Sequence, residues 1–382
     1  MTGPAAQDPT GGAALARVLR ACLAWERDEP AAGASWPAGI SLQDAVEAHR
    51  VGPVLAPWRD RLGLTASDEA WLEAKQRRNT TVALAASRQL VELVAALDAA
   101  GIRVLTLKGI PLALRTTGNL AGRHCGDIDL LVDTADLAAA DGVMRDLGYH
   151  TSVGPAASPL ADPCRRLVLT MNNQLVFSAP GRQPVEIHWR LTKHELLPLP
   201  FDEAWAARTS MAVAGADVAI LGDEHERLFV TVHAAKHHFM RMKWLVDVTR
   251  LLTDVDAASW VATCALAHRL GLAVTVEGSR AMAARLAPRR VQRVVGLSSS
   301  ERRRAARLTT LMWSTCLRGE EGRLDRRFHA LRMRRGLRYR AGVVGSAFPL
   351  RLLDTGASSL LLPFRRVPGW AQRMVERATT SR

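Results

Sequence analysis

Residues 126–132 read GDIDLLV, which predicts a buried strand with two acidic side chains on one face. Successive side chains of a strand point to opposite faces, so Asp127 and Asp129 share a face at a spacing of about 7 Å. The apolar side chains between them point into a core. Two carboxylates so close repel each other unless a cation lies between them, and Mg²⁺ prefers such oxygen ligands together with substrate phosphates. The alternative, an Asp-x-Asp turn at a solvated edge, is disfavoured by the apolar run.

A second alternating segment supplies a third carboxylate. Residues 185–189 read VEIHW, so Glu186 and His188 share one face of another strand. If this strand lies beside the first, Glu186 completes a group of three carboxylates. The alternative is an exposed strand glutamate that pairs with a charge on a neighbouring strand.

Basic residues upstream are candidates for phosphate binding. A short strand is expected at 102–107, and Lys108 and Gly109 form a tight turn from it into a helix. Glycine lets a phosphate approach the backbone, and the N–H groups and dipole of a helix start favour that anion. Lys108 would add a positive charge. Arg123, just before the aspartates, is a second candidate or else an ordinary surface arginine.

These motifs, in this order, resemble the DNA polymerase β nucleotidyltransferase superfamily. More narrowly, they resemble a bacterial family of uncharacterised nucleotidyltransferases with an L-K-G turn and an E-[LI]-H-W-R-L strand, over roughly residues 40–255. The resemblance implies that Asp127 and Asp129 bind two Mg²⁺ ions, with Mn²⁺ as an alternative, and that Glu186 helps position the attacking hydroxyl. It also implies that Lys236 meets the triphosphate of an NTP such as ATP.

One feature departs from the superfamily pattern. Its members usually carry a Gly-Ser turn closer to the first aspartate, whereas Gly109 precedes Asp127 by 18 residues and follows a lysine. The departure affects the inferred phosphate contacts of Lys108 and Gly109 more than the metal site.

Two histidines on a predicted helix raise the question of a zinc site. His233 and His237 are four residues apart and share a face with Trp244 if the helix continues. Zinc would need a third ligand, and the glutamate of an HExxH motif is absent. Partly buried histidines at a domain interface are therefore the favoured interpretation.

Hydrophobic periodicity predicts an α+β fold, with a small mixed-sheet core, a helical N-terminal cap and a mostly α-helical C-terminal region. Ser67 is expected to cap a long helix that ends before Gly101. Strands are expected at 102–107, 127–132, 166–177 and 184–189, and helices at 15–25, 42–58, 223–239, 243–254, 256–269 and 272–286. The predicted divisions are a disordered tail (1–12), the helical cap (13–84), the nucleotidyltransferase core (85–192), a connecting segment (193–222), a helical domain (223–345) and an extension (346–382).

Composition narrows the class of protein. The net charge of +14 comes from arginine, since only five of the 51 basic residues are lysines. Guanidinium groups suit phosphate and RNA partners, although a GC-rich genome produces the same bias. The stretch RMRRGLRYR at 332–340 has two interpretations. It contacts RNA or an acidic membrane, or it is the solvated face of a helix, which is the favoured interpretation.

Cysteine usage and hydropathy indicate the compartment. Five scattered cysteines without a CxxC pair predict reduced thiols and a cytoplasmic protein. No uninterrupted apolar run approaches the roughly 18 residues of a membrane span, so no stable membrane insertion is expected.

The function expected from these features is transfer of a nucleoside monophosphate from an NTP to a hydroxyl or phosphate acceptor, with release of pyrophosphate. The acceptor would be a small molecule, a peptide or a protein. Two alternatives remain: a toxin-like tRNA nucleotidyltransferase, and a catalytically silent nucleotide- or RNA-binding accessory protein.

Overall fold

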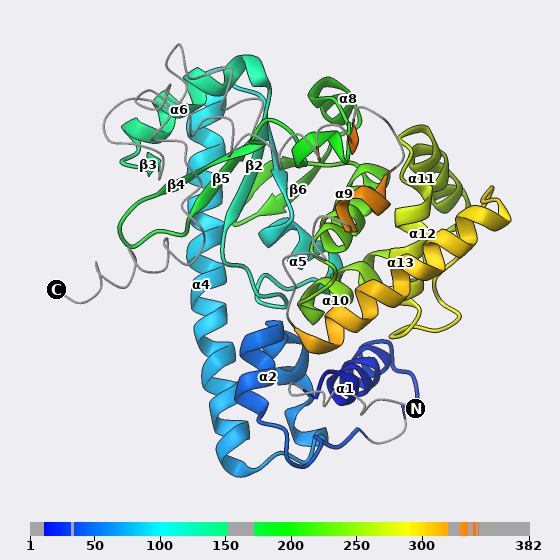
Figure 1. Cartoon of the computed structure of the whole chain (residues 1–382). Helices are drawn as coiled ribbons and strands as arrows, with labels where there is room; N and C mark the ends of the chain where they lie inside the picture. The colour runs from blue at the N-terminus through cyan, green and yellow to red at the C-terminus, as the bar shows by residue number, and fades with distance from the viewer. Residues whose placement is uncertain are drawn as a thin grey trace, which may run out of the picture.

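The computed structural model describes residues 11–31, 34–151, 172–319, 329–334, 339–340 and 343. Within these residues, seven strands form one mixed sheet in the order β3-β4-β5-β2-β1-β7-β6, and helices pack around it (Figure 1). The predicted α+β class is confirmed. The strands are β1 (Val104–Leu107), β2 (Ile128–Val132), β3 (His150–Thr151), β4 (Gln174–Ser178), β5 (Val185–His188), β6 (Thr209–Val213) and β7 (Ala216–Ile220).

Strand β2 lies at the centre of the sheet, between β1 and β5. It pairs antiparallel with β1, which places Leu107 opposite Asp129. It pairs parallel with β5, which places Glu186 opposite the same aspartate. The expectation that the strand of Glu186 lies beside the strand of the aspartates is therefore confirmed.

The two faces of the central strands belong to two hydrophobic cores. Ile128, Leu130 and Val132 pack with helices α4 (Ala66–Ala99) and α6 (Leu137–Asp146). Leu131 faces the other way and joins a core built largely from helices of the second half of the chain. Because side chains alternate along a strand, Asp129 points to this second face, toward those helices.

Helix α4 runs along almost the full height of the molecule (Figure 1). The side chain of Thr65 caps its start by accepting a hydrogen bond from the backbone N–H of Asp68 at 3.2 Å. The predicted cap, Ser67, is therefore wrong by two residues, because Ser67 already lies in the first helical turn. The predicted stop is confirmed, since Gly101 follows the helix with a φ of 73°.

By length and composition, α4 is the one helix in the described part of the chain that could cross a membrane. Such a match is weak evidence, because core helices of globular proteins meet the same criterion. Leu90, Leu93 and Leu97 of α4 are buried against the sheet. The helix thus packs as a core element of the fold.

The N-terminal helices lie beside the lower part of α4 (Figure 1). Helix α1 (Gly12–Trp25) agrees with the prediction. The single helix predicted at 42–58 is wrong: α2 (Leu42–His49) ends at Arg50, which adopts a left-handed conformation with φ 56°. A new helix then starts, because Pro53 fits only a first turn. The pieces that follow are α3 (Gly52–Leu55) and the 3₁₀ helix η1 (Ala56–Arg61).

The segment 193–222 contains two strands that the sequence did not predict. Ala214 and Gly215, with φ of 48° and 87°, form a two-residue turn between β6 and β7. Strand β7 pairs parallel with β1, so this hairpin extends the sheet. The segment 193–222 also holds η3 (Lys193–Glu195) and α8 (Phe201–Ala206). The predicted division of the chain into domains stays a prediction.

The helical pattern predicted for the second half is confirmed, with shifts of up to three residues at the helix ends. The helices of the second half are α9 (Asp223–Lys236), α10 (Met242–Leu252), α11 (Ala257–Arg269), α12 (Ala273–Ala283) and α13 (Ser299–Arg318). Two further elements lie in the first half, α5 (Gly109–Thr117) and η2 (Thr134–Asp136).

Some predictions fall on residues outside the described ranges. They are the tail up to residue 10, the start of the strand predicted at 166–177, residues 335–338 of the basic stretch, the extension at 346–382, and Cys164. The other four cysteines are free and buried, in agreement with the expected reduced thiols.

Replacing Thr65 with alanine is expected to lower the free energy of unfolding by about 1 kcal/mol, because the first turn of α4 loses its side-chain cap. Ser67→Ala is the matched control and should change it by no more than about 0.5 kcal/mol. Urea denaturation followed by circular dichroism measures both. A larger effect of Ser67→Ala than of Thr65→Ala would contradict the capping assignment.

Candidate active site

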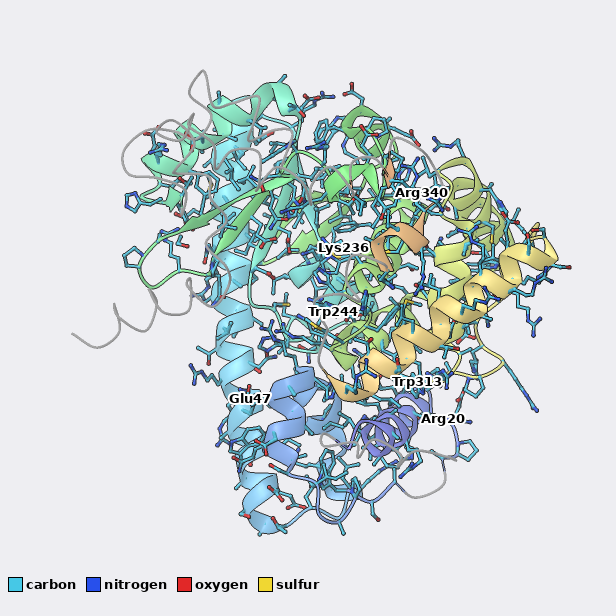
Figure 2. The ribbon with its side chains drawn as sticks, viewed as in Figure 1. Arg20, Glu47, Lys236, Trp244, Trp313 and Arg340 are labelled. Carbon is cyan, nitrogen blue, oxygen red and sulfur yellow. The ribbon has the colours of Figure 1, made fainter. Side chains whose placement is uncertain are left out.

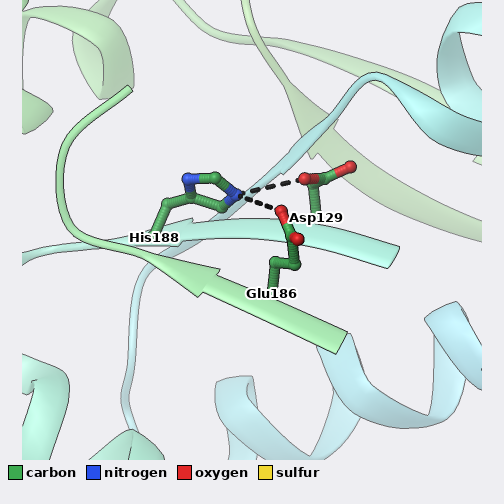
Figure 3. A group of neighbouring side chains, drawn as sticks. All are labelled: Asp129, Glu186 and His188. Atoms are coloured by element: carbon green, nitrogen blue, oxygen red, sulfur yellow. Dashed lines mark hydrogen bonds and ion pairs between the residues drawn. The ribbon is translucent and has the colours of Figure 1, made fainter. Parts of the chain in front are cut away.

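Three side chains from neighbouring strands converge on the face of the sheet next to α9 and α10. Asp129 comes from β2, and Glu186 and His188 come from β5 (Figure 3). Nε2 of His188 lies 3.1 Å from Oδ1 of Asp129 and 3.3 Å from Oε2 of Glu186. Among the residues that the structure describes, this is the one group of His, Cys, Asp and Glu side chains close enough to hold a metal ion.

A buried ammonium group compensates the charge of Asp129. Lys108 follows β1 and precedes α5, and its Nζ donates a hydrogen bond to Oδ1 of Asp129 at 2.6 Å. Burial opposes ionisation of Asp129, but Lys108 and the hydrogen bond from His188 outweigh it and hold the pKa of this carboxyl well below its usual range. Asp129 is therefore a carboxylate at neutral pH.

The remaining oxygen of Asp129 is unpaired. Its Oδ2 is buried and has no hydrogen-bond partner among the described residues. An anionic oxygen that is buried without a partner raises the free energy of the folded state unless a cation or a hydrogen-bond donor reaches it. This oxygen, together with the carboxylate of Glu186, suits a hard divalent cation.

Asp127 lies just before β2 and lines the same cavity, but outside the compact group. Its carboxylate is half-buried and forms no hydrogen bond or ion pair with a residue in the described ranges. Asp127 and Glu186 of the predicted trio thus line one cavity, and Asp129 lies buried beside Glu186. His188 is the residue that sequence reasoning passed over, although the alternation in VEIHW placed it on the face of Glu186.

The carboxylates border a cavity of about 520 Å³ between the sheet, α9 and α10. Its described lining holds more cations than anions, so it favours an anionic ligand. The lining carboxylates are those of Asp127 and Glu186. The basic side chains are Arg50, Lys108, Arg123, Lys193, Lys236, Arg241 and Lys243.

Lys236 lies at the last turn of α9 (Figure 2) and lines this cavity. Its ammonium group forms no hydrogen bond or ion pair with any residue that the structure describes. Burial, together with the charges of Lys108 and Lys193, lowers the pKa of Lys236 to about 8. A bound anion would relieve this repulsion.

Arg123 also lines the cavity, but its guanidinium is anchored elsewhere. Nε donates to both oxygens of Asp247 on α10, at 2.9 and 3.0 Å. This buried ion pair ties the loop before β2 to α10. Asp247 is thus a structural partner of Arg123. The predicted contact of Arg123 with a nucleotide stays a prediction.

Gly109 allows the turn between β1 and α5. Its φ of 55° lies in the region that side-chain-bearing residues rarely adopt. A Cβ there would lie 3.6 Å from the carbonyl oxygen of Asp127, so the turn packs directly against the aspartate segment. The predicted strand–turn–helix geometry is confirmed, whereas the phosphate contact stays a prediction.

Aromatic rings form another part of the cavity wall. His237 stacks on Trp244 with ring centroids 5.0 Å apart, and His233 contacts both rings. The condition for a shared helix face, that the helix continues from the histidines to the tryptophan, is not met, although the rings do meet. Instead, α9 ends at Lys236 and Trp244 lies on α10. Burial lowers the pKa of His233 well below its usual value, which fits a neutral interface histidine.

Comparisons with known proteins agree with this arrangement. The model of the family described as uncharacterised nucleotidyltransferase matches residues 41–288, about two thirds of the chain. This range includes the sheet, α9, α10 and each residue that lines the cavity. Searches of curated proteins and of solved structures found no match. By this match, the chain belongs to the uncharacterised nucleotidyltransferase family.

Proposed function

We propose that the protein transfers a nucleoside monophosphate from an NTP to a hydroxyl or phosphate acceptor and releases pyrophosphate. The observation that carries the proposal is the convergence of Asp129 and Glu186 at the edge of a cavity rich in cations. Family membership supports nucleotidyl transfer as the class of reaction.

The residues present fit a divalent cation. Asp127, Asp129 and Glu186 would hold it, since one oxygen of Asp129 and the carboxylate of Asp127 lack partners among the described residues. Mg²⁺, or Mn²⁺, would neutralise charge on the triphosphate and lower the pKa of the acceptor hydroxyl. Hydrogen bonding to both carboxylates raises the pKa of His188 against the effect of burial, so its Nε2–H holds Asp129 and Glu186 in place.

The cationic side chains would hold the leaving phosphates. Lys108 at the β1–α5 turn and Lys236 at the end of α9 both line the cavity. The backbone N–H groups at the start of α5 add a favourable dipole for the same anion, next to Gly109. Arg123, whose Nε is paired with Asp247, would reach the nucleotide only through the rest of its guanidinium group. The stacked rings of His237 and Trp244 offer a flat surface for the nucleobase.

The transfer itself is an in-line displacement. The acceptor oxygen forms a bond to the α-phosphorus, and the bond from that phosphorus to the bridging oxygen breaks as pyrophosphate leaves. Glu186, whose side chain is partly exposed to the cavity, orients the acceptor hydroxyl. The proton of that hydroxyl passes to solvent.

Incubation of the full chain with Mg²⁺ and each radiolabelled NTP, with and without bulk tRNA, tests the proposal. Label on a small molecule, a peptide or a protein supports it. Label on RNA supports the toxin-like transferase instead. Tight NTP binding without any transfer supports the silent accessory protein.

Asp127→Asn is expected to lower label transfer by about a thousandfold, because contacts to a catalytic cation supply several kcal/mol of transition-state stabilisation. The melting temperature should stay unchanged, since the carboxylate has no partner among the described residues. Electron paramagnetic resonance should show weaker Mn²⁺ binding. Asp217→Asn makes the same change on an exposed position of β7 outside the cavity and should retain activity. Full activity of Asp127→Asn would refute the assigned role.

Nucleotide affinity is expected to fall as the pH rises through about 8, because only protonated Lys236 attracts phosphates and its pKa is about 8. The neighbouring charges of Lys108 and Lys193 favour this deprotonation, while Glu186 and Asp129 oppose it. In Lys236→Arg the guanidinium stays charged, so the affinity should fall less above about pH 8 than it does in the unsubstituted protein. Titration of a fluorescent ATP analogue between pH 6.5 and 9.5 measures both. An identical pH dependence in the two proteins would rule out Lys236.

A further inference from the structure

The cations of the cavity fall into two groups according to the carboxylates near them. Lys236 interacts electrostatically with Lys108, Lys193 and Glu186, and Lys108 is hydrogen-bonded to Asp129. A second group, Arg50, Arg241 and Lys243, lies near Asp127. The residues of this second group come from the end of α2 and the start of α10.

The two arginines of the second group are uncommitted. In the described ranges, the guanidinium groups of Arg50 and Arg241 form no hydrogen bond and no ion pair. Arg241 lies over the ring of Trp244, 5.8 Å from its centroid. Nη1 of Arg50 lies 3.9 Å from the position that a Cβ on Gly126 would take, so it sits beside the backbone that leads to Asp127. Partly buried cations without partners indicate a site for an anion.

The backbone of Arg50 allows a clean test of its side chain. Arg50 ends α2 with φ 56° and ψ 42°, a left-handed conformation in which glycine is favoured. Replacement with glycine therefore removes the guanidinium group without straining the backbone.

The second group lies between two cavities. Arg50 and Arg241 line both the main cavity and a smaller cavity of about 210 Å³ between α2 and α4. Glu47 and Lys75, which form an ion pair, and His124 also line the smaller cavity. An anion held between the two arginines would therefore border both volumes.

Charge compensation requires more than the nucleotide. Divalent cations bound with an NTP would cancel most of its charge, so the NTP alone would leave the second group uncompensated. Burial lowers the pKa of Lys243 to about 7, so a bound anion would favour its charged form. Among the described residues, its Nζ donates a hydrogen bond only to the carbonyl oxygen of His124, at 3.4 Å.

We propose that Arg50 and Arg241, with Lys243, bind a phosphate group of the acceptor while the NTP occupies the side of Lys108 and Lys236. The proposal rests on the proposed function and names its acceptor class, a phosphorylated molecule. A phosphate has enough oxygens to accept paired hydrogen bonds from both guanidinium groups, whereas a carboxylate has only two oxygens.

Calorimetric titration of inorganic phosphate into the full chain, saturated with Mg²⁺ and α,β-methylene-ATP, tests the proposal. Phosphate is expected to bind alongside the analogue. Arg50→Gly should weaken phosphate binding at least about tenfold, because charge-assisted hydrogen bonds are lost. It should change the affinity for the analogue by less than about twofold and leave the melting temperature equal or higher, since glycine suits the left-handed conformation.

Arg289→Gly is the matched control, because Arg289 is also an arginine with positive φ, at 71°, but is exposed and outside both cavities. It should retain phosphate and analogue binding. Competition between phosphate and the analogue, an equal loss of both in Arg50→Gly, or undiminished phosphate binding in that variant would each overturn the inference. If the wild type fails to bind the analogue but binds phosphate through Arg50, the proposed function fails while the anion site remains.

Discussion

The parallel pairing of β2 with β5 is the constraint on which the site depends. It places Glu186 directly opposite Asp129, so two carboxylates stand side by side at the distance of neighbouring strands. Such a pair is tolerated in a buried sheet only because cations offset its charge. Lys108 from the turn after β1 and His188 from β5 supply that compensation within the protein.

The cavity shows how buried charge and ligand preference are connected. Some of its cations are satisfied internally, as Arg123 is by Asp247 on α10. Others, including Lys236 and Arg50, face the open volume without a described partner, and burial lowers the pKa of both. A negatively charged ligand would interact favourably with these cations and offset the cost of burying them. The same property makes the cavity unsuitable for neutral, apolar molecules.

Sequence patterns predicted the parts of the site that rest on local periodicity. The alternation in GDIDLLV and VEIHW was sufficient for both strands and for Asp129 and Glu186, because a buried strand shows its two faces in its own residues. The hairpin of β6 and β7 escaped prediction because residues 209–220 read TSMAVAGADVAI, in which small alanines blur the contrast between the faces. Arg50 and the Arg123–Asp247 pair also escaped it. Their roles depend on contacts between segments far apart in the chain, which no local pattern records.

The hairpin of β6 and β7 has a mechanical consequence for the cavity. Strand β7 is bonded to β1, and α9 begins three residues after β7 ends. Lys108 at the end of β1 and Lys236 on α9 are therefore parts of one continuous framework. Without this hairpin, β1 would expose unpaired backbone groups along an open edge. The two lysines are thus linked through the hydrogen-bonded strands β1 and β7 and the short connection from β7 to α9.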